Sequence, residues 1–392
     1  MDNKKNGIPK LRFPGFTGAW EQRKFSEFAT YSGKRNKDNL DLEPYAITSD
    51  NGFVRQSEAH NEFGYMKNTD RAAYKIVQSN SFGYNPARIN IGSIGYYSGD
   101  KNIIVSSLYE VFKTNQDVND EFLWIWFKSN RFQKWINKLQ EGSVRLYFYY
   151  DKLRETKIQL PNLEEQRQVA DLFTNLDSLI ALHQRKLEHL QEQKKGLLQK
   201  MFPKNGETVP EVRFPGFTDA WEQRKLGEVV NFLDTLRKPL EGAKRVKGPY
   251  PYYGASGIVD YVDGYLFDEE LILLSEDGAN ITERNYPVCF LASGKYWVNN
   301  HAHVLKIKED NDNNFICNSL ERKDYTKYNT GMAMPKLNKE TCKGIPIMCP
   351  NYDEQKKIGN YFRKFDTLIA LHQRKLDHLE LMKKGLLQQM FV

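Results

Sequence analysis

The stretch LDSLIALHQRKLEHLQEQKKGLLQKMF occupies residues 176–202, and FDTLIALHQRKLDHLELMKKGLLQQMF returns at residues 365–391. In both copies the seam residues recur at alternating steps of four and three, which is the 3.5-residue period of a coiled coil. The first seam consists of Leu176, Ile180, His183, Leu187, Leu190, Lys194, Leu197 and Met201. The second consists of Phe365, Ile369, His372, Leu376, Leu379, Lys383, Leu386 and Met390. The pattern predicts two long helices that pair with each other.

Both seams are interrupted by polar residues at matching places, His183 with Lys194 and His372 with Lys383. Polar seam residues set register and partner choice at a cost in stability. Because a whole domain lies between the seams, we expect an antiparallel pair within the chain, with the domains at opposite ends. Pairing with another protein or with a second copy of the chain is the alternative. A helix over residues 176–201 would span ~39 Å, close to the roughly 34–36 Å of one turn of B-DNA.

A second duplicated stretch opens each half of the chain. It reads LRFPGFTGAWEQRKFSEF at residues 11–28 and VRFPGFTDAWEQRKLGEV at residues 212–229, and the residues that follow differ between the halves. We call the duplicated stretches the frame, and we call the dissimilar stretches between them the first filling, which ends before Pro161, and the second filling, which ends before Pro350. A repeated frame around different fillings predicts two domains on one scaffold, with pseudo-twofold symmetry. We expect α+β domains at residues 1–160 and 203–349, and helical spacers at residues 161–202 and 350–392.

Local patterns predict elements inside this frame. Asn162 and Asn351 are each followed three residues later by a glutamate, Glu165 and Glu354, which is a variant of the helix-capping box. In the first filling we expect strands at residues 87–97 and 102–113 and one helix at 121–139. In the second we expect strands at residues 266–267, 271–274 and 296–308.

Composition bounds the class of protein. Of 392 residues 40% are hydrophobic, enough for packed cores, and the formal net charge of +7 has the sign expected of a polyanion binder. A slightly basic protein with no such role would have the same charge. The four cysteines, Cys289, Cys317, Cys342 and Cys349, form no CxxC pair, which argues against structural zinc and favours reduced thiols in a cytoplasmic protein. We expect no signal peptide and no membrane span, since no run of ~18 apolar residues occurs.

Catalytic signatures are weak. The sequence Asn85-Pro86-Ala87-Arg88 differs at two positions from the Asn-Pro-Pro-Tyr loop of amino-group methyltransferases, and no glycine-rich cofactor loop precedes it. Glu321-Arg322-Lys323 has the spacing of a nuclease site but lacks an upstream aspartate on a strand. His301 and His303 lie on one side of a predicted strand, and hydrogen bonding is favoured over metal binding there. We expect neither catalytic residues nor a metal site in this chain.

Residues suited to nucleic-acid contact recur in both fillings. Phosphate contacts require Lys, Arg and other donors on loops, and base readout requires Asn, Gln, Arg and Ser near them. Any one of these loops could equally be a polar loop without this role. The candidate DNA-binding residues are Lys34, Arg35, Lys37, Asn85, Arg88, Arg145 and Tyr147 in the first filling, and Arg237, Lys238, Tyr253, Ser256, Asn299, Asn300, His301 and Lys336 in the second.

Over nearly its whole length the chain resembles a specificity subunit of a type I restriction-modification system. The stretches from Pro161 to Leu187 and from Pro350 to Leu376 carry the resemblance. The Gly254-Ala255-Ser256-Gly257 turn, the turn at Gly278 and the strand from Asn299 to Leu305 match the usual second recognition domain. The first filling lacks the Gly-Ala-Ser-Gly pattern, so DNA contacts are harder to carry over to it.

The resemblance implies two target-recognition domains, each reading one half of a bipartite, asymmetric site in double-stranded DNA. It implies two modification subunits that methylate adenine with S-adenosylmethionine and two restriction subunits that use ATP and Mg²⁺, so the cofactors belong to the partners. The seam residues expected to form the coiled coil and the partner-docking scaffold are Ile180, His183, Leu187, Leu190, Leu197, Ile369, His372, Leu376, Leu379 and Leu386.

Two other functions remain open at this stage. One is a coiled-coil interaction scaffold whose domains bind proteins and not DNA. The other is a self-sufficient methyltransferase or nuclease, against which the missing cofactor loop argues. The sequence does not determine the DNA motif, the gap between half-sites or which loop residues contact bases.

Overall fold

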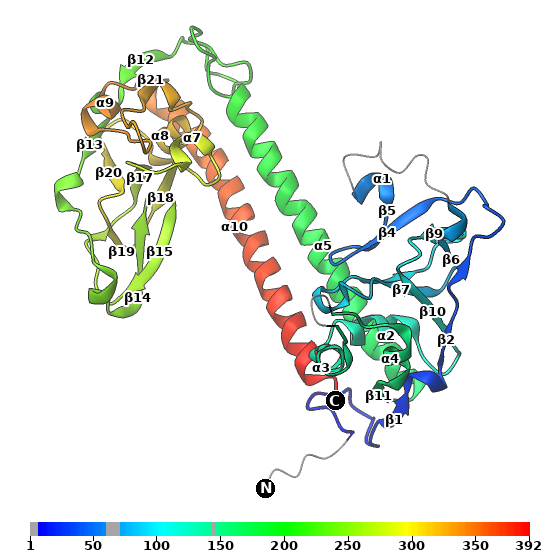
Figure 1. The fold of residues 1–392 in the computed structure, drawn as a ribbon. Coiled ribbons are helices and arrows are strands. Elements are labelled where there is room, and N and C mark those ends of the chain that lie inside the picture. Colours follow the sequence, from blue (N-terminus) through cyan, green and yellow to red (C-terminus); the bar gives the residue numbers. More distant parts are fainter. Residues whose placement is uncertain (1–6, 60–70, 143–145) are drawn as a thin grey trace. The chain divides into compact units, whose positions relative to one another are not determined.

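The computed structural model describes residues 7–59, 71–142 and 146–392 (Figure 1). The chain divides into two compact units, one of Met1–Leu182 with Lys375–Val392 and one of His183–Arg374. Each unit contains one α+β domain and part of each of two long helices, α5 (Leu163–Lys200) and α10 (Tyr352–Gln389). The predicted α+β class and the predicted pair of long helices are confirmed.

The first domain is built on two sheets and a short strand pair. The pair joins β1 (Glu21–Lys24) to β11 (Lys157–Leu160). One sheet has the order β2-β10-β7-β8, with strands Ala29–Tyr31, Glu110–Thr114, Ser81–Tyr84 and Ile94–Tyr97. The other has the order β3-β6-β9-β4-β5, with strands Lys34–Arg35, Lys75–Val77, Ile103–Val105, Pro44–Thr48 and Gly52–Arg55. Its helices are α1 (Gln56–Ala59), α2 (Asp120–Phe127), α3 (Asn130–Leu139) and α4 (Tyr150–Glu155), with 3₁₀ turns η1 (Phe25–Glu27), η3 (Arg71–Ala73) and η4 (Ile89–Ile91).

The second domain repeats this plan. Its strand pair is β12 (Glu222–Lys225) with β21 (Pro346–Cys349). One sheet has the order β13-β20-β17-β18, with strands Val230–Phe232, Ala302–Ile307, Leu271–Ser275 and Cys289–Ala292. The other has the order β15-β14-β19-β16, with strands Gly257–Val262, Lys247–Gly254, Lys295–Val298 and Phe267–Asp268. Its helices are α6 (Leu226–Val229), α7 (Asn280–Glu283), α8 (Asn313–Glu321) and α9 (Lys339–Lys343), with 3₁₀ turns η5 (Asp234–Leu236), η6 (Gly242–Lys244) and η7 (Thr326–Tyr328).

The two dissimilar fillings therefore share a topology. The sheet β2-β10-β7-β8 corresponds strand for strand to β13-β20-β17-β18. In the second sheet β6-β9-β4-β5 corresponds to β16-β19-β14-β15, and in both domains the central pair is parallel, β4 with β9 and β14 with β19. Among the described residues, the first domain has one additional strand, the edge strand β3. Where the connecting residues are described, this common topology relates a loop of one domain to the loop between the corresponding strands of the other.

Within each unit the parts of α5 and α10 run antiparallel. In the unit of His183–Arg374, His183 Nδ1 lies 2.8 Å from His372 Nδ1, and Lys194 Nζ lies 2.6 Å from Asp366 Oδ1. In the other unit Lys383 pairs with Asp177. All sixteen seam positions predicted from the 3.5-residue period are buried or half-buried, so both seams face inward as predicted.

Four predicted elements were too long. The stretch 296–308 is two strands, β19 and β20, because the side chain of Asn299 accepts a hydrogen bond from the His301 amide and stabilises a turn between them. The helix expected at 121–139 is two helices, since the Ser129 hydroxyl bonds to the Trp126 carbonyl where α2 ends. Residues 102–113 form β9 and β10, and in 87–97 only Ile94–Tyr97 is a strand.

In the part of the chain that the structure describes, no helix combines the length and hydropathy needed to cross a membrane.

Candidate nucleic-acid interface

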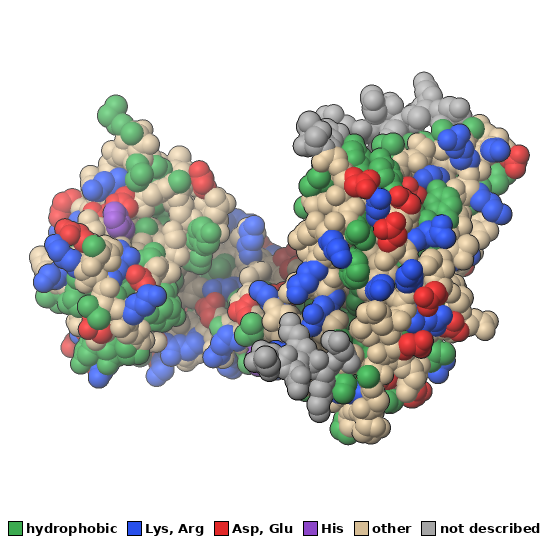
Figure 2. Space-filling view, turned by 60° about the horizontal axis from the view of Figure 1, so that its bottom comes forward, with side chains coloured by type: hydrophobic (Ala, Val, Ile, Leu, Met, Phe, Trp, Pro, Cys, Tyr) green, Lys and Arg blue, Asp and Glu red, His purple; other side chains and the backbone are tan. Residues whose placement is uncertain are grey.

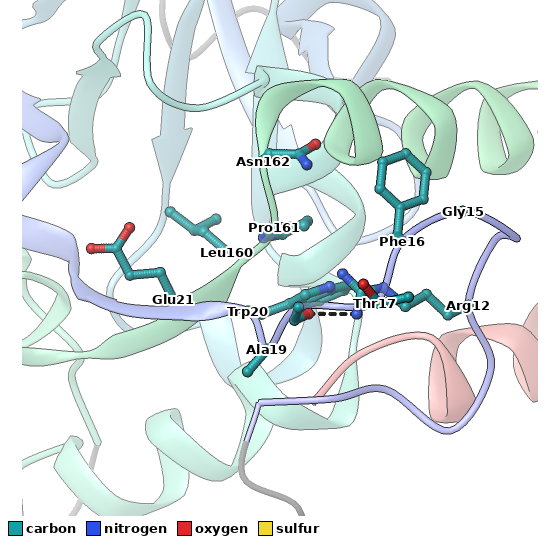
Figure 3. A pocket seen from close by; sticks show the side chains of 11 residues that line it. Arg12, Gly15, Phe16, Thr17, Ala19, Trp20, Glu21, Leu160, Pro161 and Asn162 are labelled. Atoms are coloured by element: carbon teal, nitrogen blue, oxygen red, sulfur yellow. Dashed lines mark hydrogen bonds between the residues drawn. The ribbon is translucent and has the colours of Figure 1, made fainter.

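An ion pair ties each RFPGF segment to the start of a long helix. Arg12 donates from Nε and Nη2 to the two carboxylate oxygens of Glu165, at 2.7 Å each, and the Trp20 indole donates to the same carboxylate at 3.2 Å. In the second unit Arg213 donates in the same way to the two carboxylate oxygens of Glu354, at 2.7 Å each. Figure 3 shows Arg12 and Trp20 at a pocket that Phe16, Leu160, Pro161 and Asn162 also line. The duplicated motif thus fixes where each domain meets its helix.

The same turn contains the predicted helix caps. Asn162 Oδ1 accepts from the Glu165 amide at 2.9 Å, and Asn351 does the same for Glu354 at 3.0 Å. The capping box is not reciprocal, however, because both glutamate side chains pair with arginine instead of the helix start. Each following glutamine contacts its domain: Gln166 Oε1 accepts from the Asn119 amide at 2.8 Å, and Gln355 Oε1 accepts from the Asp312 amide at 3.3 Å.

In the second domain four segments that are distant in sequence meet at one edge. They are the tip of the β14–β15 hairpin, residues 276–278 after β17, the turn at residues 299–301, and the loop at residues 329–337. Ser275 Oγ donates to the Ala255 carbonyl at 2.6 Å, and the Glu276 amide donates to the His301 carbonyl at 2.9 Å. The Gly278 amide donates to the Pro335 carbonyl at 3.0 Å. We call these four segments the second recognition edge.

Most predicted contact residues of the second filling lie on or beside this edge. His301 is half-exposed with Nδ1 2.8 Å from Asp277 Oδ1, so Nε2 is the ring nitrogen available to a ligand. Lys336 is exposed, with Nζ 3.6 Å from Glu276 Oε1. Asn300, Ser256 and Lys238 are exposed as well. The edge therefore carries a cation, an imidazole, an amide and a hydroxyl group on exposed side chains.

Three of the predicted residues have internal roles instead. The Arg237 guanidinium donates to Glu276 at 2.6 Å and to the Ala302 carbonyl at 2.7 Å, so its charge is neutralised inside the domain. Asn299 is buried in the turn. Tyr253 packs between Phe290 and Tyr296, and burial raises the pKa of its phenol. These contacts make the three residues supports of the edge, and their contact with DNA stays a prediction.

A buried aspartate–histidine pair holds the loop 329–337 in place. Asp234 Oδ2 lies 2.8 Å from His303 Nδ1, and His303 Nε2 lies 2.7 Å from the Leu337 carbonyl oxygen. Burial of Asp234 opposes its ionisation. Hydrogen bonding and charge from His303, the Val304 amide and the charge of Arg237 outweigh this and lower the pKa of the carboxyl below its ordinary value. Each histidine thus pairs with its own aspartate, and among the described residues no three His, Cys, Asp or Glu side chains could jointly hold a metal ion.

The first domain has a counterpart, the first recognition edge. Asn85 and Arg88 follow β7, the strand that corresponds to β17, and the Phe148 amide donates to the Pro86 carbonyl at 3.0 Å. This places Tyr147 beside Asn85 and Arg88, and Arg88 is exposed. The exposed Lys34, Arg35 and Lys37 lie on and after edge strand β3. The predicted residue Arg145 lies outside the described residues.

Sequence reasoning missed Glu276 and Asp277, since a search for polyanion contacts discards acidic residues. Their position directly after a buried strand was the available signal. They explain how His301, Arg237 and Lys336 are oriented. Figure 2 shows acidic side chains interspersed among Lys and Arg on the face in view of each domain, without a continuous patch of one sign. Charge alone therefore does not mark a binding surface on this face, and the two edges are defined by the convergence of loops.

Comparison with known proteins shows what the two halves of the chain are similar to. A family model described as type I restriction modification DNA specificity domain matches residues 18–192 and again residues 218–381. The two matches together span more than half of the chain and fall on its two halves.

Individual relatives match in part or in full. A putative type I restriction enzyme specificity subunit of Haemophilus influenzae is 38% identical over 168 residues, which is 43% of this chain and 42% of that protein. The putative type I restriction enzyme MjaX specificity subunit of Methanocaldococcus jannaschii is 24% identical over 98% of this chain and 95% of its own length. The crystal structure of a type I restriction-modification S subunit from M. genitalium shares the fold, with a TM-score of 0.68, 14% identity, and coverage of 98% of this chain and 99% of that one.

Proposed function

Because the chain belongs to the family of type I restriction-modification DNA specificity domains, we propose that each of its two domains reads one half of a bipartite, asymmetric site in double-stranded DNA. The observation that carries the proposal is the pair of recognition edges: one topology, occupied by different side chains. The first edge presents Asn85, Arg88 and Tyr147, and the second presents Asp277, His301 and Lys336. Different donors and acceptors at corresponding places select different base pairs.

Readout on this proposal takes place in the major groove, where all four base pairs differ. Exposed cations such as Arg88 and Lys336 contact phosphates and set the register of each domain on the duplex, which makes binding salt-dependent. The chain positions DNA and does not transform it. Extrusion of the target adenine from the helix belongs to the subunit that methylates it.

The partners follow from the duplicated frame. Two identical modification subunits would dock one on each copy of the frame, and two restriction subunits would complete the assembly with their own S-adenosylmethionine, ATP and Mg²⁺. In this arrangement residues 1–160 and 203–349 recognise DNA, and the spacers 161–202 and 350–392 set the gap between half-sites. A scaffold that binds only proteins gains no support from the matched family.

Mapping of methylated adenines tests the function. The chain is co-expressed with its modification partner, and methylated adenines are mapped by sequencing. We expect a bipartite, asymmetric motif, and a continuous motif or no methylation would refute the proposal. In a second strain residues 30–160 are replaced by the corresponding filling of a relative. Only one half of the motif should change, and a change in both halves would show that the domains do not read independently.

A further inference from the structure

The loop 329–337 presents methionine to solvent at the second recognition edge. It reads Asn-Thr-Gly-Met-Ala-Met-Pro-Lys-Leu, and neither the nucleic-acid candidates nor the proposed function uses its two methionines. Met332 is fully exposed and Met334 is 61% exposed. Large apolar side chains in such a position cost solvation free energy until a ligand covers them.

The loop is ordered by its own hydrogen bonds. Asn329 Oδ1 accepts from the amides of Gly331 at 2.9 Å and Lys336 at 2.8 Å, and the Thr330 amide donates to the Lys336 carbonyl at 2.8 Å. A Cβ atom on Gly331 would lie 1.8 Å from the Met334 carbonyl oxygen, so only glycine fits there. At the base, the Leu337 amide donates to the Glu276 carbonyl at 2.7 Å. Met332 is thus held outward on a preorganised loop, which lowers the entropic cost of a contact.

In the first domain the described residues at the two ends of the corresponding stretch match the ends of loop 329–337. Glu141 and Tyr147 exchange two backbone hydrogen bonds, of 2.9 and 2.7 Å, where Thr330 bonds to Lys336 in the second domain. In both loops a glycine precedes a fully buried apolar residue by six positions, Gly142 before Phe148 and Gly331 before Leu337. Leu146, in this loop, is exposed. An apolar group at the loop is therefore common to both edges, although the sequences differ.

We propose that Met332 contacts the C5-methyl group of a thymine in the major groove of the second half-site. The inference rests on the proposed DNA-reading function. The thymine methyl is the apolar group among the base edges of unmodified DNA in that groove, so it is the partner that a Met side chain can cover without burying a polar atom unpaired. Lys336, four residues further on, is placed for the adjoining phosphate, and His301 with Asp277 for neighbouring polar base edges.

The test couples a side-chain deletion to a methyl deletion in the DNA. The chain in complex with its modification partner is titrated with its mapped site, in which each thymine of the second half is replaced in turn by deoxyuridine. We expect one replacement to weaken binding by roughly four-fold, the value of one buried methyl group. Met332→Ala should weaken binding to the thymine site to a similar degree or more, and should abolish the sensitivity to that one replacement.

The control is Met382→Ala, the same truncation of an exposed methionine on α10. This variant should keep the full sensitivity to deoxyuridine, and both variants should keep the wild-type thermal midpoint because neither side chain is buried. The inference is overturned if the second half-site contains no thymine, or if every deoxyuridine effect is the same in wild type and Met332→Ala. Loss of specific DNA binding by the wild-type complex would instead refute the proposed function itself.

Discussion

The guanidinium group of Arg12 forms two hydrogen bonds of 2.7 Å to the carboxylate of Glu165, which is 153 residues away in sequence. Arg213 and Glu354 form the same pair in the second unit, also with two bonds of 2.7 Å. Both carboxylates are almost completely buried, with 1% and 0% of the side chain exposed. Each pair joins the RFPGF segment near the start of a domain to the long helix that follows that domain. The two pairs therefore hold together the two ends of each copy of the duplicated frame.

Removal of one arginine should therefore destabilise its unit strongly. In Arg12→Ala the Glu165 carboxylate remains buried without its cation, and we expect a loss of about 3 kcal/mol in the free energy of unfolding. The control is Arg167→Ala, whose partner Glu164 lies 3.9 Å away and is exposed. Such a surface pair should contribute less than about 0.5 kcal/mol. Urea unfolding measures both, and equal losses in the two variants would contradict the importance of the buried pair.

The histidine pair in the coiled coil should be a site where stability can be increased. His183 and His372 occupy facing seam positions, 2.8 Å apart at their Nδ1 atoms. Replacement of both by leucine converts a polar layer into an apolar one, and we expect a gain on the order of 1 kcal/mol. His189→Leu with His378→Leu, on exposed helix faces, should give no gain. A lower thermal midpoint for the seam variant than for the wild type would refute the assignment.

Two cations of the second edge should differ in their effect on salt dependence. Lys336 is exposed and loosely paired, whereas Arg237 is held by Glu276 and by backbone carbonyls. We expect Lys336→Ala to reduce the slope of log affinity against log salt by about 0.9, the value of one phosphate contact. Arg237→Ala should lower the stability of the domain and leave the slope unchanged. Binding titrations over a salt series measure this, and a slope reduced by Arg237→Ala alone would reverse the two assignments.

Acid should weaken the support of loop 329–337. The environment of Asp234 lowers its pKa in the folded protein, so its ionised form contributes stability above the unfolded pKa of about 3.9. That contribution is lost as the pH falls through the folded pKa. We expect the stability difference between wild type and Asp234→Asn to shrink as the pH falls below about 5, because the carboxylate loses its charge there. Urea unfolding over a pH series tests this, with Asp268→Asn at an exposed strand edge as the control. A difference that widens in acid would contradict the prediction.

The length of the spacers should set the gap in the DNA site. Insertion of one heptad at equivalent places in α5 and α10 preserves the seam and adds ~10 Å. We expect the gap between half-sites to grow by about three base pairs, while the half-sites themselves stay the same. Methylation mapping reads both. An unchanged gap, or altered half-sites, would show that the helices are not the spacer.

The sequence by itself determined the frame of this protein. Features that depend on the spacing of nearby residues can be predicted from the amino-acid sequence alone. They are the seams from Leu176 and from Phe365, the caps at Asn162 and Asn351, and the duplicated RFPGF segments. The α+β class followed from the strand and helix patterns of the fillings, and the family resemblance followed from the repeats together with the Gly254–Gly257 turn, Gly278 and the strand at residues 299–305. The DNA-binding residues remain predictions.

Only the tertiary structure decided how the fillings are built and which polar residues face outward. The common topology of the two domains arises from strand pairings between distant segments, which dissimilar sequences satisfy with different side chains. Arg237 was indistinguishable from a phosphate ligand until Glu276 and the Ala302 carbonyl were placed around it. The second recognition edge is assembled by hydrogen bonds between residues as far apart as Asp234, His303 and Leu337, and no local pattern encodes a contact over such separations.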